Sequence, residues 1–194
     1  TTVAPASAYL GALGLTTGLT AYFGIVDVGQ VKPGDTVVVS GAAGAVGSVA
    51  GQIARLSGAS KVIGIAGGAH KSKFLVDELK FDAAIDYKNE NVAARLDELA
   101  PDGINVFFDN VGGDILDDVL MRIVEGSRIV ICGGISQYEN MDDVRGPKNY
   151  LKMAERRARM EGVAVFHFAA HYARAEMSLA DWPRSGQFDV REQI

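Results

Sequence analysis

Short apolar runs alternate along this chain with longer segments in which apolar residues recur at helical spacing. The short runs have the length of strands, and the longer segments have the length of helices. The runs predict strands at 36–40, 61–65, 83–86, 104–109, 128–132 and 162–168. The segments between them predict helices at 45–57, 71–79, 91–99, 114–124 and 150–160.

Two of the predicted strands contain runs of consecutive apolar residues, Val37-Val38-Val39 and Ile129-Val130-Ile131. Such runs are typical of strands that are buried on both faces, as in a parallel sheet. Because strands and helices alternate strictly, we expect an α/β fold with a doubly wound, six-stranded parallel sheet and right-handed crossovers. The turn residues at 32–35 and 101–103 agree with these boundaries.

The sheet accounts for nearly the whole chain, so we expect a single domain over 1–194. Residues 1–30 would hold lead-in helices, with a clear helical pattern at 16–29. Residues 171–183 would form a helix that leaves the sheet, and the polar segment 184–194 would be a tail.

The first predicted strand runs directly into the glycine-rich turn 41–47 and then into a helix. A phosphate group needs closely approachable backbone N–H groups and the positive end of a helix dipole, and this order supplies both. The turn matches the dinucleotide pattern G-x-G-x-x-G except that Ala42 stands at its first position. Gly44 would admit a pyrophosphate, and Gly47 would let the helix pack on the strand. The alternative is a glycine-rich connection without a ligand.

The end of the second predicted strand bears on the choice between NAD and NADP. An NAD site usually has an Asp or Glu there, which binds the 2′-hydroxyl of the ribose. Here the strand is followed by Ala66-Gly67-Gly68-Ala69-His70-Lys71, which contains a cation and no carboxylate. Because an ammonium group neutralises a 2′-phosphate, this favours NADP. The alternative is that Lys71 is an ordinary surface lysine.

Two further glycine turns follow the fourth and fifth predicted strands, at 109–113 and 132–136. In a parallel sheet, both turns would lie at the carboxyl edge, where ligands bind. Each turn could instead only supply positive φ angles, but three turns at one edge favour a ligand crevice.

Composition and charge exclude several other classes. The net charge of −5 gives no support for a nucleic-acid partner, and we interpret the basic cluster 156–159 as a solvated helix face. The uncharged stretches 1–26 and 36–54 are interpreted as core segments, not membrane spans. A single cysteine, Cys132, excludes an internal disulfide framework and fits a reducing, cytoplasmic compartment.

Metal and nucleophile sites are not expected. No Cys or His precedes His70, so the usual zinc ligands are missing around the first strand. His167 and His171 lack the Glu of an H-E-x-x-H motif and are interpreted as surface or edge residues. Cys132 is interpreted as a small apolar residue at the end of a buried strand.

Five stretches together resemble one family: 18–24, 42–49, 85–88, 109–113 and 132–138. They are similar to the cofactor domain of zinc-free medium-chain dehydrogenases/reductases. More narrowly, they resemble the branch of prostaglandin reductase (leukotriene B4 12-hydroxydehydrogenase) and curcumin reductase. The resemblance covers residues 10 to 168. Family members also carry an N-terminal barrel-like domain, so this chain resembles their cofactor domain alone, which would be inactive without the other domain.

The resemblance implies an oxidoreductase that uses NADP(H) to reduce the C=C bond of α,β-unsaturated ketones and aldehydes. It places the pyrophosphate on Gly44, Ala45, Val46 and Gly47, and the 2′-phosphate end on Lys71 and Tyr87. Ribose and nicotinamide would be lined by Asn110, Cys132, Gly133, Gly134, Ile135, Ser136, Gln137 and Tyr138, with Val163 and Val165 at the nicotinamide end. It assigns no catalytic residue.

Two other functions remain open at this point: a quinone oxidoreductase of the same superfamily, and a dinucleotide-binding module without catalysis. A homodimer is a further hypothesis. The last predicted strand would lie at the sheet edge, and its apolar run 163–166 could pair with a second copy.

Overall fold

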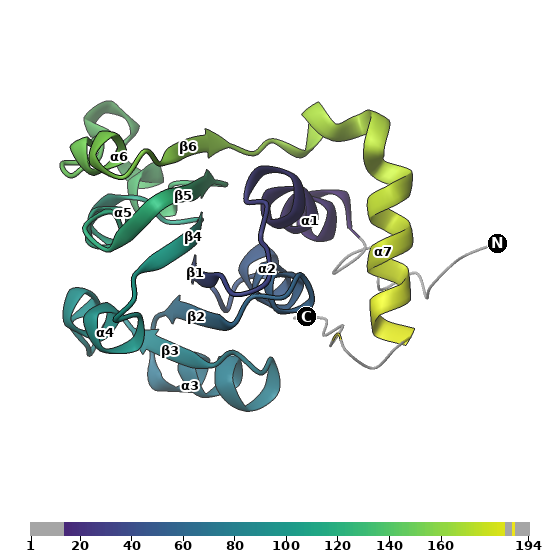
Figure 1. The fold of residues 1–194 in the computed structure, drawn as a ribbon, viewed down its shortest axis with the longest axis horizontal. Coiled ribbons are helices and arrows are strands. Elements are labelled where there is room, and N and C mark those ends of the chain that lie inside the picture. The colour runs from purple at the N-terminus through teal and green to yellow at the C-terminus, as the bar shows by residue number, and fades with distance from the viewer. Residues whose placement is uncertain (1–13, 185–187, 189–194) are drawn as a thin grey trace.

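The computed structural model describes residues 14–184 and 188, and its centre is one parallel sheet (Figure 1). The strand order is β3-β2-β1-β4-β5-β6, and every neighbouring pair is parallel. This confirms the predicted doubly wound α/β fold, in which the order reverses between β1 and β4. The strands are β1 Thr36–Ser40, β2 Lys61–Ala66, β3 Ala83–Asp86, β4 Ile104–Asp109, β5 Ile123–Ile131 and β6 Arg159–Gly162.

Helices cover both faces of the sheet, so the domain has three layers (Figure 1). One apolar cluster joins the sheet to α2 and to the helical segment 15–28 that precedes β1, called the lead-in segment below. Its members include Phe23, Ile53 and Phe108. The other cluster joins the opposite face to α4 and α5, with members such as Leu96 and Leu120. The α-helices are α1 Thr20–Tyr22, α2 Ala45–Leu56, α3 Ala69–Lys73, α4 Val92–Leu99, α5 Gly113–Leu120, α6 Leu151–Glu155 and α7 Tyr172–Arg184.

Shorter helical turns extend several of these elements. The helix predicted at 16–29 is observed as continuous helical structure over residues 15–28, partly with π-type hydrogen bonding, and it ends one residue earlier than predicted. Phe23 stacks on Phe168, with ring centroids 4.6 Å apart, and joins this segment to the C-terminal part of the chain. Of the predicted tail 184–194, only Arg184 and Phe188 lie within the described residues. The π-type turns are η2 Leu15–Leu19, η3 Phe23–Val28 and η4 Phe74–Glu78, and the 3₁₀ turns are η5 Ile135–Asp143 and η6 Val165–His171.

The sequence prediction was wrong at the last strand, because β6 is Arg159–Gly162 and not 162–168. The apolar run that suggested a strand is extended for only a few residues and then enters η6. Val163 still donates a hydrogen bond to Ile131 O at 2.9 Å, but Val163 and Val165 are buried in the core beside the lead-in segment. Their alternating burial reflects this packing and not a strand of the sheet.

The predicted helix 150–160 was also wrong in its second half. The helix α6 ends at Glu155, and Arg157 has a φ of 47°, which a continuing right-handed helix does not allow. The basic cluster 156–159 is therefore not a helix face, since it turns the chain into β6. Likewise, β5 begins at Ile123, five residues earlier than predicted, because the chain turns at Gly126 with a φ of 75° and stays paired with β4 through a register shift.

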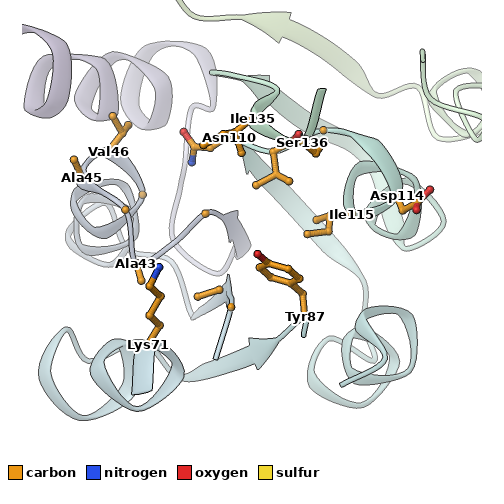
Figure 2. A pocket seen from close by; sticks show the side chains of 17 residues that line it. Ala43, Ala45, Val46, Lys71, Tyr87, Asn110, Asp114, Ile115, Ile135 and Ser136 are labelled. Atoms are coloured by element: carbon orange, nitrogen blue, oxygen red, sulfur yellow. Dashed lines mark hydrogen bonds between the residues drawn. The ribbon is translucent and has the colours of Figure 1, made fainter. Parts of the chain in front are cut away.

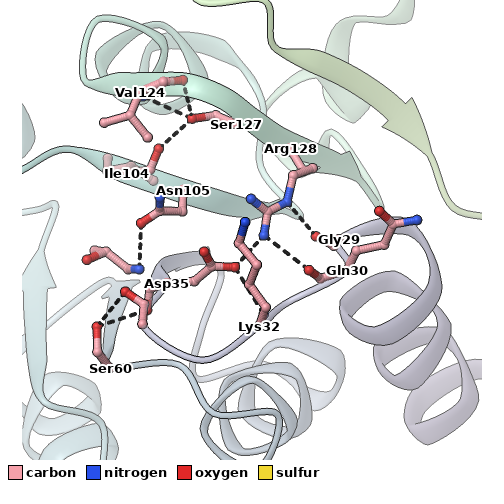
Figure 3. Close-up of polar contacts among 12 residues, drawn as sticks. Gly29, Gln30, Lys32, Asp35, Ser60, Ile104, Asn105, Val124, Ser127 and Arg128 are labelled. Atoms are coloured by element: carbon pink, nitrogen blue, oxygen red, sulfur yellow. Dashed lines mark hydrogen bonds and ion pairs between the residues drawn. The ribbon is translucent and has the colours of Figure 1, made fainter.

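The amino edge of the sheet is held by a buried ion pair between Arg128 of β5 and Asp35, the residue before β1 (Figure 3). The guanidinium group also donates to Gly29 O at 2.9 Å and to Gln30 O at 3.1 Å. Arg128 thus binds the carbonyl groups where the lead-in helical segment ends. This pair lies at the edge opposite the carboxyl ends of the strands, so its role is to hold the lead-in segment against the sheet.

Candidate functional site

A cavity of about 750 Å³ lies at the carboxyl ends of β1, β2 and β4, in front of the first turn of α2 (Figure 2). This is the edge at which parallel α/β sheets bind ligands, beside the point where the strand order reverses. The cavity is lined by Gly41, Ala43, Gly44, Ala45, Val46, Gly47, Ala66, Gly67, Lys71, Tyr87, Asn110, Val111, Gly112, Asp114, Ile115, Ile135 and Ser136.

The first turn of α2 offers uncapped backbone N–H groups to this cavity. The first intrahelical hydrogen bond runs from Ser48 N to Gly44 O, at 3.0 Å. The N–H groups of Ala45, Val46 and Gly47 therefore precede the helical ladder. No side chain makes a capping hydrogen bond at Gly44, and the first turn contains no acidic residue. This end of the helix can receive an anionic group.

The helix lies so close to the turn that only glycine fits at position 47. A Cβ atom there would stand 2.4 Å from Gly41 O and 2.8 Å from Ala42 Cα. Both are backbone atoms, so no side-chain rotation can relieve the clash. The spacing of the glycine motif thus sets the approach of α2 to β1, and with it the shape of the anion-binding end.

Lys71 and Tyr87 stand at one end of the cavity, on the side of β2 and β3 (Figure 2). Lys71 belongs to the short helix α3, is exposed, and forms no ion pair within the described residues. Its ammonium group is therefore available to an anion. Tyr87 follows β3 and is half-exposed beside it.

A carboxylate does lie near this end, at Asp86, but its acceptors are already engaged. Asp86 accepts hydrogen bonds from Gly68 N at 2.6 Å, from Lys88 N at 3.1 Å and from Asn89 Nδ2 at 2.7 Å. The bond from Asn89, followed by that from Gly68, holds the pKa of this carboxyl below its ordinary value. Asp86 therefore fixes the turn that presents Lys71.

The opposite end of the cavity is formed by the segments after β4 and β5, which are tied to each other. Asn110 O accepts from Ile135 N at 3.1 Å, and Val111 O accepts from Ser136 Oγ at 2.6 Å. Behind them, the carboxyl of Asp109 is fully buried. Burial raises the pKa of Asp109, against the opposing hydrogen bonds from Gly112 N and the Ser40 hydroxyl.

The structure brings nine of the predicted site residues to this one cavity. These are Gly44, Ala45, Val46, Gly47, Lys71, Tyr87, Asn110, Ile135 and Ser136. The other predicted residues lie nearby without lining it. Cys132, Gly133 and Gly134 link β5 to η5, Tyr138 Oη accepts from Gly134 N at 3.1 Å, and Gln137 lines an adjacent cavity of about 340 Å³. Val163 and Val165 are core residues.

Sequence reasoning missed several lining residues, above all Asp114 and Ile115 in the first turn of α5. Neither belongs to a glycine motif, so only the three-dimensional arrangement identifies them. Gly41, Val111 and Gly112 belong to turns that the sequence did point out, and these could have been included.

The described residues contain no group of three or more His, Cys, Asp or Glu side chains that could hold a metal ion. His167 and His171 are exposed, as predicted. Burial, with a smaller contribution from the charge of Asp109, raises the pKa of the Cys132 thiol to about 11. The thiol is therefore protonated at neutral pH, in agreement with its interpretation as an apolar residue. Between residues 14 and 184, no helix has the length and apolarity needed to cross a bilayer.

Residues 45–180 match the family of zinc-binding dehydrogenases. The chain belongs to this family. It is 47% identical to the putative NADP-dependent oxidoreductase YfmJ of Bacillus subtilis, over 100% of this chain and 58% of the relative. It is 43% identical to the NADP(+)-dependent 2-alkenal reductase of Nicotiana tabacum (88% and 49% covered) and 40% identical to prostaglandin reductase 1 of Mus musculus (98% and 57% covered).

Solved structures agree with this assignment. CurA from Vibrio vulnificus in complex with NADPH superposes with a TM-score of 0.89 at 40% identity, over 96% of this chain and 56% of CurA. A quinone oxidoreductase from Pseudomonas syringae pv. Tomato DC3000 superposes with a TM-score of 0.76 at 29% identity, over 92% and 54%. The resemblance to the prostaglandin and curcumin reductase branch is confirmed. The chain spans about half the length of the curated relatives that it matches.

Proposed function

We propose that this chain is the NADP(H)-binding part of a reductase that acts on the C=C bond of α,β-unsaturated ketones and aldehydes. The observation that carries the proposal is the position of Lys71. It places an ammonium group, which forms no ion pair with the residues that the structure describes, at one end of a cavity whose middle is a glycine-lined helix N-terminus. A dinucleotide with a 2′-phosphate has negative charge at both of these places. The name of the NADP(+)-dependent 2-alkenal reductase supports both the substrate class and the cofactor. The structure of CurA in complex with NADPH supports the cofactor.

The residues of the cavity fit the parts of this cofactor in sequence. The N–H groups of residues 45–47 would hold the pyrophosphate, and Lys71 with Tyr87 would hold the 2′-phosphate end. Asn110, Ile135 and Ser136 would hold the ribose and nicotinamide. When bound, NADPH supplies the hydride, so the work of these residues is binding and orientation. The contacts assigned by resemblance to Cys132–Gly134, Gln137, Tyr138, Val163 and Val165 stay predictions.

The test is a turnover assay that follows NADPH oxidation with the complete protein. An enone and p-benzoquinone serve as alternative substrates, and calorimetry of NADPH binding to this chain runs beside them. We expect binding and reduction of the enone. Turnover of the quinone alone would identify a quinone oxidoreductase, and binding without either turnover would identify a non-catalytic module.

We further propose a homodimer that forms through the edge strand β6. The apolar run 163–166, through which sequence analysis expected the pairing, lies outside β6, so the strand residues 159–162 take its place in this hypothesis. All four residues of β6 are exposed, and the strand lies at the sheet edge. In an antiparallel pairing centred on Met160, Arg159 would face the partner's Glu161, which joins opposite charges. Sedimentation velocity that finds only monomer at high concentration would contradict the dimer.

We also propose a cytoplasmic location, since the chain has a single, partly buried cysteine and therefore cannot form an internal disulfide. Cell fractionation with antibody detection tests this. Recovery in the secreted fraction would contradict it.

A further inference from the structure

Ser40 and Asp109 are the last residues of two neighbouring strands, β1 and β4, and both are fully buried. Ser40 Oγ donates to Asp109 Oδ1 at 2.7 Å and accepts from Asn110 N at 2.8 Å. The hydroxyl therefore joins the glycine turn after β1 to the segment after β4. Neither residue lines the cavity, and neither was among the predicted cofactor contacts.

The same pair of strands fixes the side chain of Asn110. Asn110 Nδ2 donates to Ser40 O at 2.7 Å, and this assigns the amide orientation because a carbonyl oxygen can only accept. Asn110 Oδ1 takes no hydrogen bond from the residues that the structure describes. Since Asn110 lines the cavity, this oxygen is an acceptor left for a bound molecule.

The backbone beyond Asn110 is held by the buried carboxyl of Asp109. Val111 N donates to Asp109 Oδ1 at 2.9 Å, and Gly112 N donates to it at 3.0 Å. Together with the two bonds to Ser40, these contacts hold Asn110 from both sides. Loss of the Ser40 hydroxyl would leave Asn110 N without its acceptor and Asp109 Oδ1 without one donor.

The location of Asn110 relative to α2 indicates which half of the cofactor it meets. Lys71 and Tyr87 lie on the β2 and β3 side of β1, whereas Asn110 lies on the β4 side (Figure 2). With the pyrophosphate at the start of α2 and the 2′-phosphate at Lys71, the nicotinamide nucleoside extends toward Asn110.

We propose that Ser40 is a positioning residue for the nicotinamide half of the cofactor. Its buried hydroxyl holds Asn110 so that Oδ1 accepts a hydrogen bond from a hydroxyl or amide group of the nicotinamide nucleoside. This inference rests on the proposed function, and it adds a residue that does not itself touch the cofactor.

The test compares two ligands by calorimetry on Ser40→Ala. NADPH contains both halves of the cofactor, whereas adenosine 2′,5′-bisphosphate contains the adenosine and 2′-phosphate without the nicotinamide nucleoside. We expect the Kd of NADPH to rise about tenfold, as for the loss of one oriented hydrogen bond. The Kd of adenosine 2′,5′-bisphosphate should stay unchanged.

Ser127→Ala is the matched control. Ser127 is also buried, but it lies at the amino edge of the sheet (Figure 3). Its hydroxyl accepts a hydrogen bond from Val124 N and lies within donor distance, 2.7 Å, of both Ile104 O and Val124 O. Its removal should lower stability and leave the Kd of both ligands unchanged. A general loss of stability is thereby separated from a loss of positioning.

A second variant, Asn110→Ala, tests the same inference at a partly exposed position. It should weaken NADPH selectively, and Ser40→Ala added to it should weaken NADPH no further, because Ser40 acts through Asn110. Equal weakening of both ligands in Ser40→Ala, no weakening, or full additivity in the double variant would overturn the inference. If the unmodified chain binds neither ligand, the proposed function itself fails.

Discussion

Replacement of Gly47 by alanine tests the geometry of the phosphate-binding end most severely. The new Cβ would lie 2.4 Å from Gly41 O and 2.8 Å from Ala42 Cα. Ordinary contacts need about 3.4 Å, so the start of α2 must move away from the turn by roughly 1 Å. Overpacking of this kind costs about 1–3 kcal/mol, which lowers the Tm of a domain of this size by about 2–12 °C.

The same movement withdraws the N–H groups of residues 45–47 from a bound pyrophosphate. Because a hydrogen bond to a charged group contributes about 1.5–3 kcal/mol, loss of one raises the Kd of NADPH by about 10- to 150-fold. Calorimetry gives the Kd, and differential scanning calorimetry gives the Tm.

Gly51→Ala in the same helix is the control. Its Cβ would stand 1.9 Å from Cζ of the buried Phe81 ring, so this substitution also overpacks the helix, but Gly51 does not line the cavity. It should lower the Tm and leave the Kd unchanged. An unchanged Kd in Gly47→Ala, or an equal rise in both variants, would refute the assignment of this turn to the cofactor.

Two further predictions concern buried charges. Arg128→Met should lower the free energy of unfolding by about 3–5 kcal/mol, because it leaves the Asp35 carboxylate buried without its cation. NADPH affinity should be retained. Urea titrations measure the free energy of unfolding, and a loss below about 1 kcal/mol would contradict this prediction. Burial raises the pKa of Asp109 in the folded state above its ordinary 3.8, so the folded protein binds the proton more tightly. The stability of the unmodified protein relative to Asp109→Asn should therefore fall as the pH rises from 3.8 through this raised pKa. Urea titrations at several pH values measure the difference, and one that is flat or rises with pH would be the contrary result.

Local sequence signals were sufficient for most of the sheet. The strands at 36–40, 83–86 and 104–109 have the predicted bounds because a turn residue or a polar residue stands at each end of an apolar run. The errors lie where tertiary contacts decide. β6 is a polar, exposed strand that forms because it pairs with β5, and its sequence RMEG carries no strand pattern of its own.

Most of the site could also be predicted from local sequence signals. Glycine motifs carry a strong signal, since they require close backbone approach, and they led to the residues that line the cavity around α2. The contribution of Ser40 could not be seen, because it depends on the pairing of β1 with β4, which brings Ser40 to Asp109, 69 positions away in sequence. Asp114 and Ile115 were missed because they enter the cavity only through the placement of α5.

The central claim is that the cavity at the start of α2 binds a 2′-phosphorylated dinucleotide, with Lys71 as the residue that selects it. The most direct measurement is a calorimetric titration of the chain with NADPH and with NADH, repeated on Lys71→Ala. NADPH should bind at least about tenfold more tightly than NADH, and Lys71→Ala should remove most of this preference while NADH affinity is retained. Equal affinity of the unmodified chain for both cofactors would contradict the account.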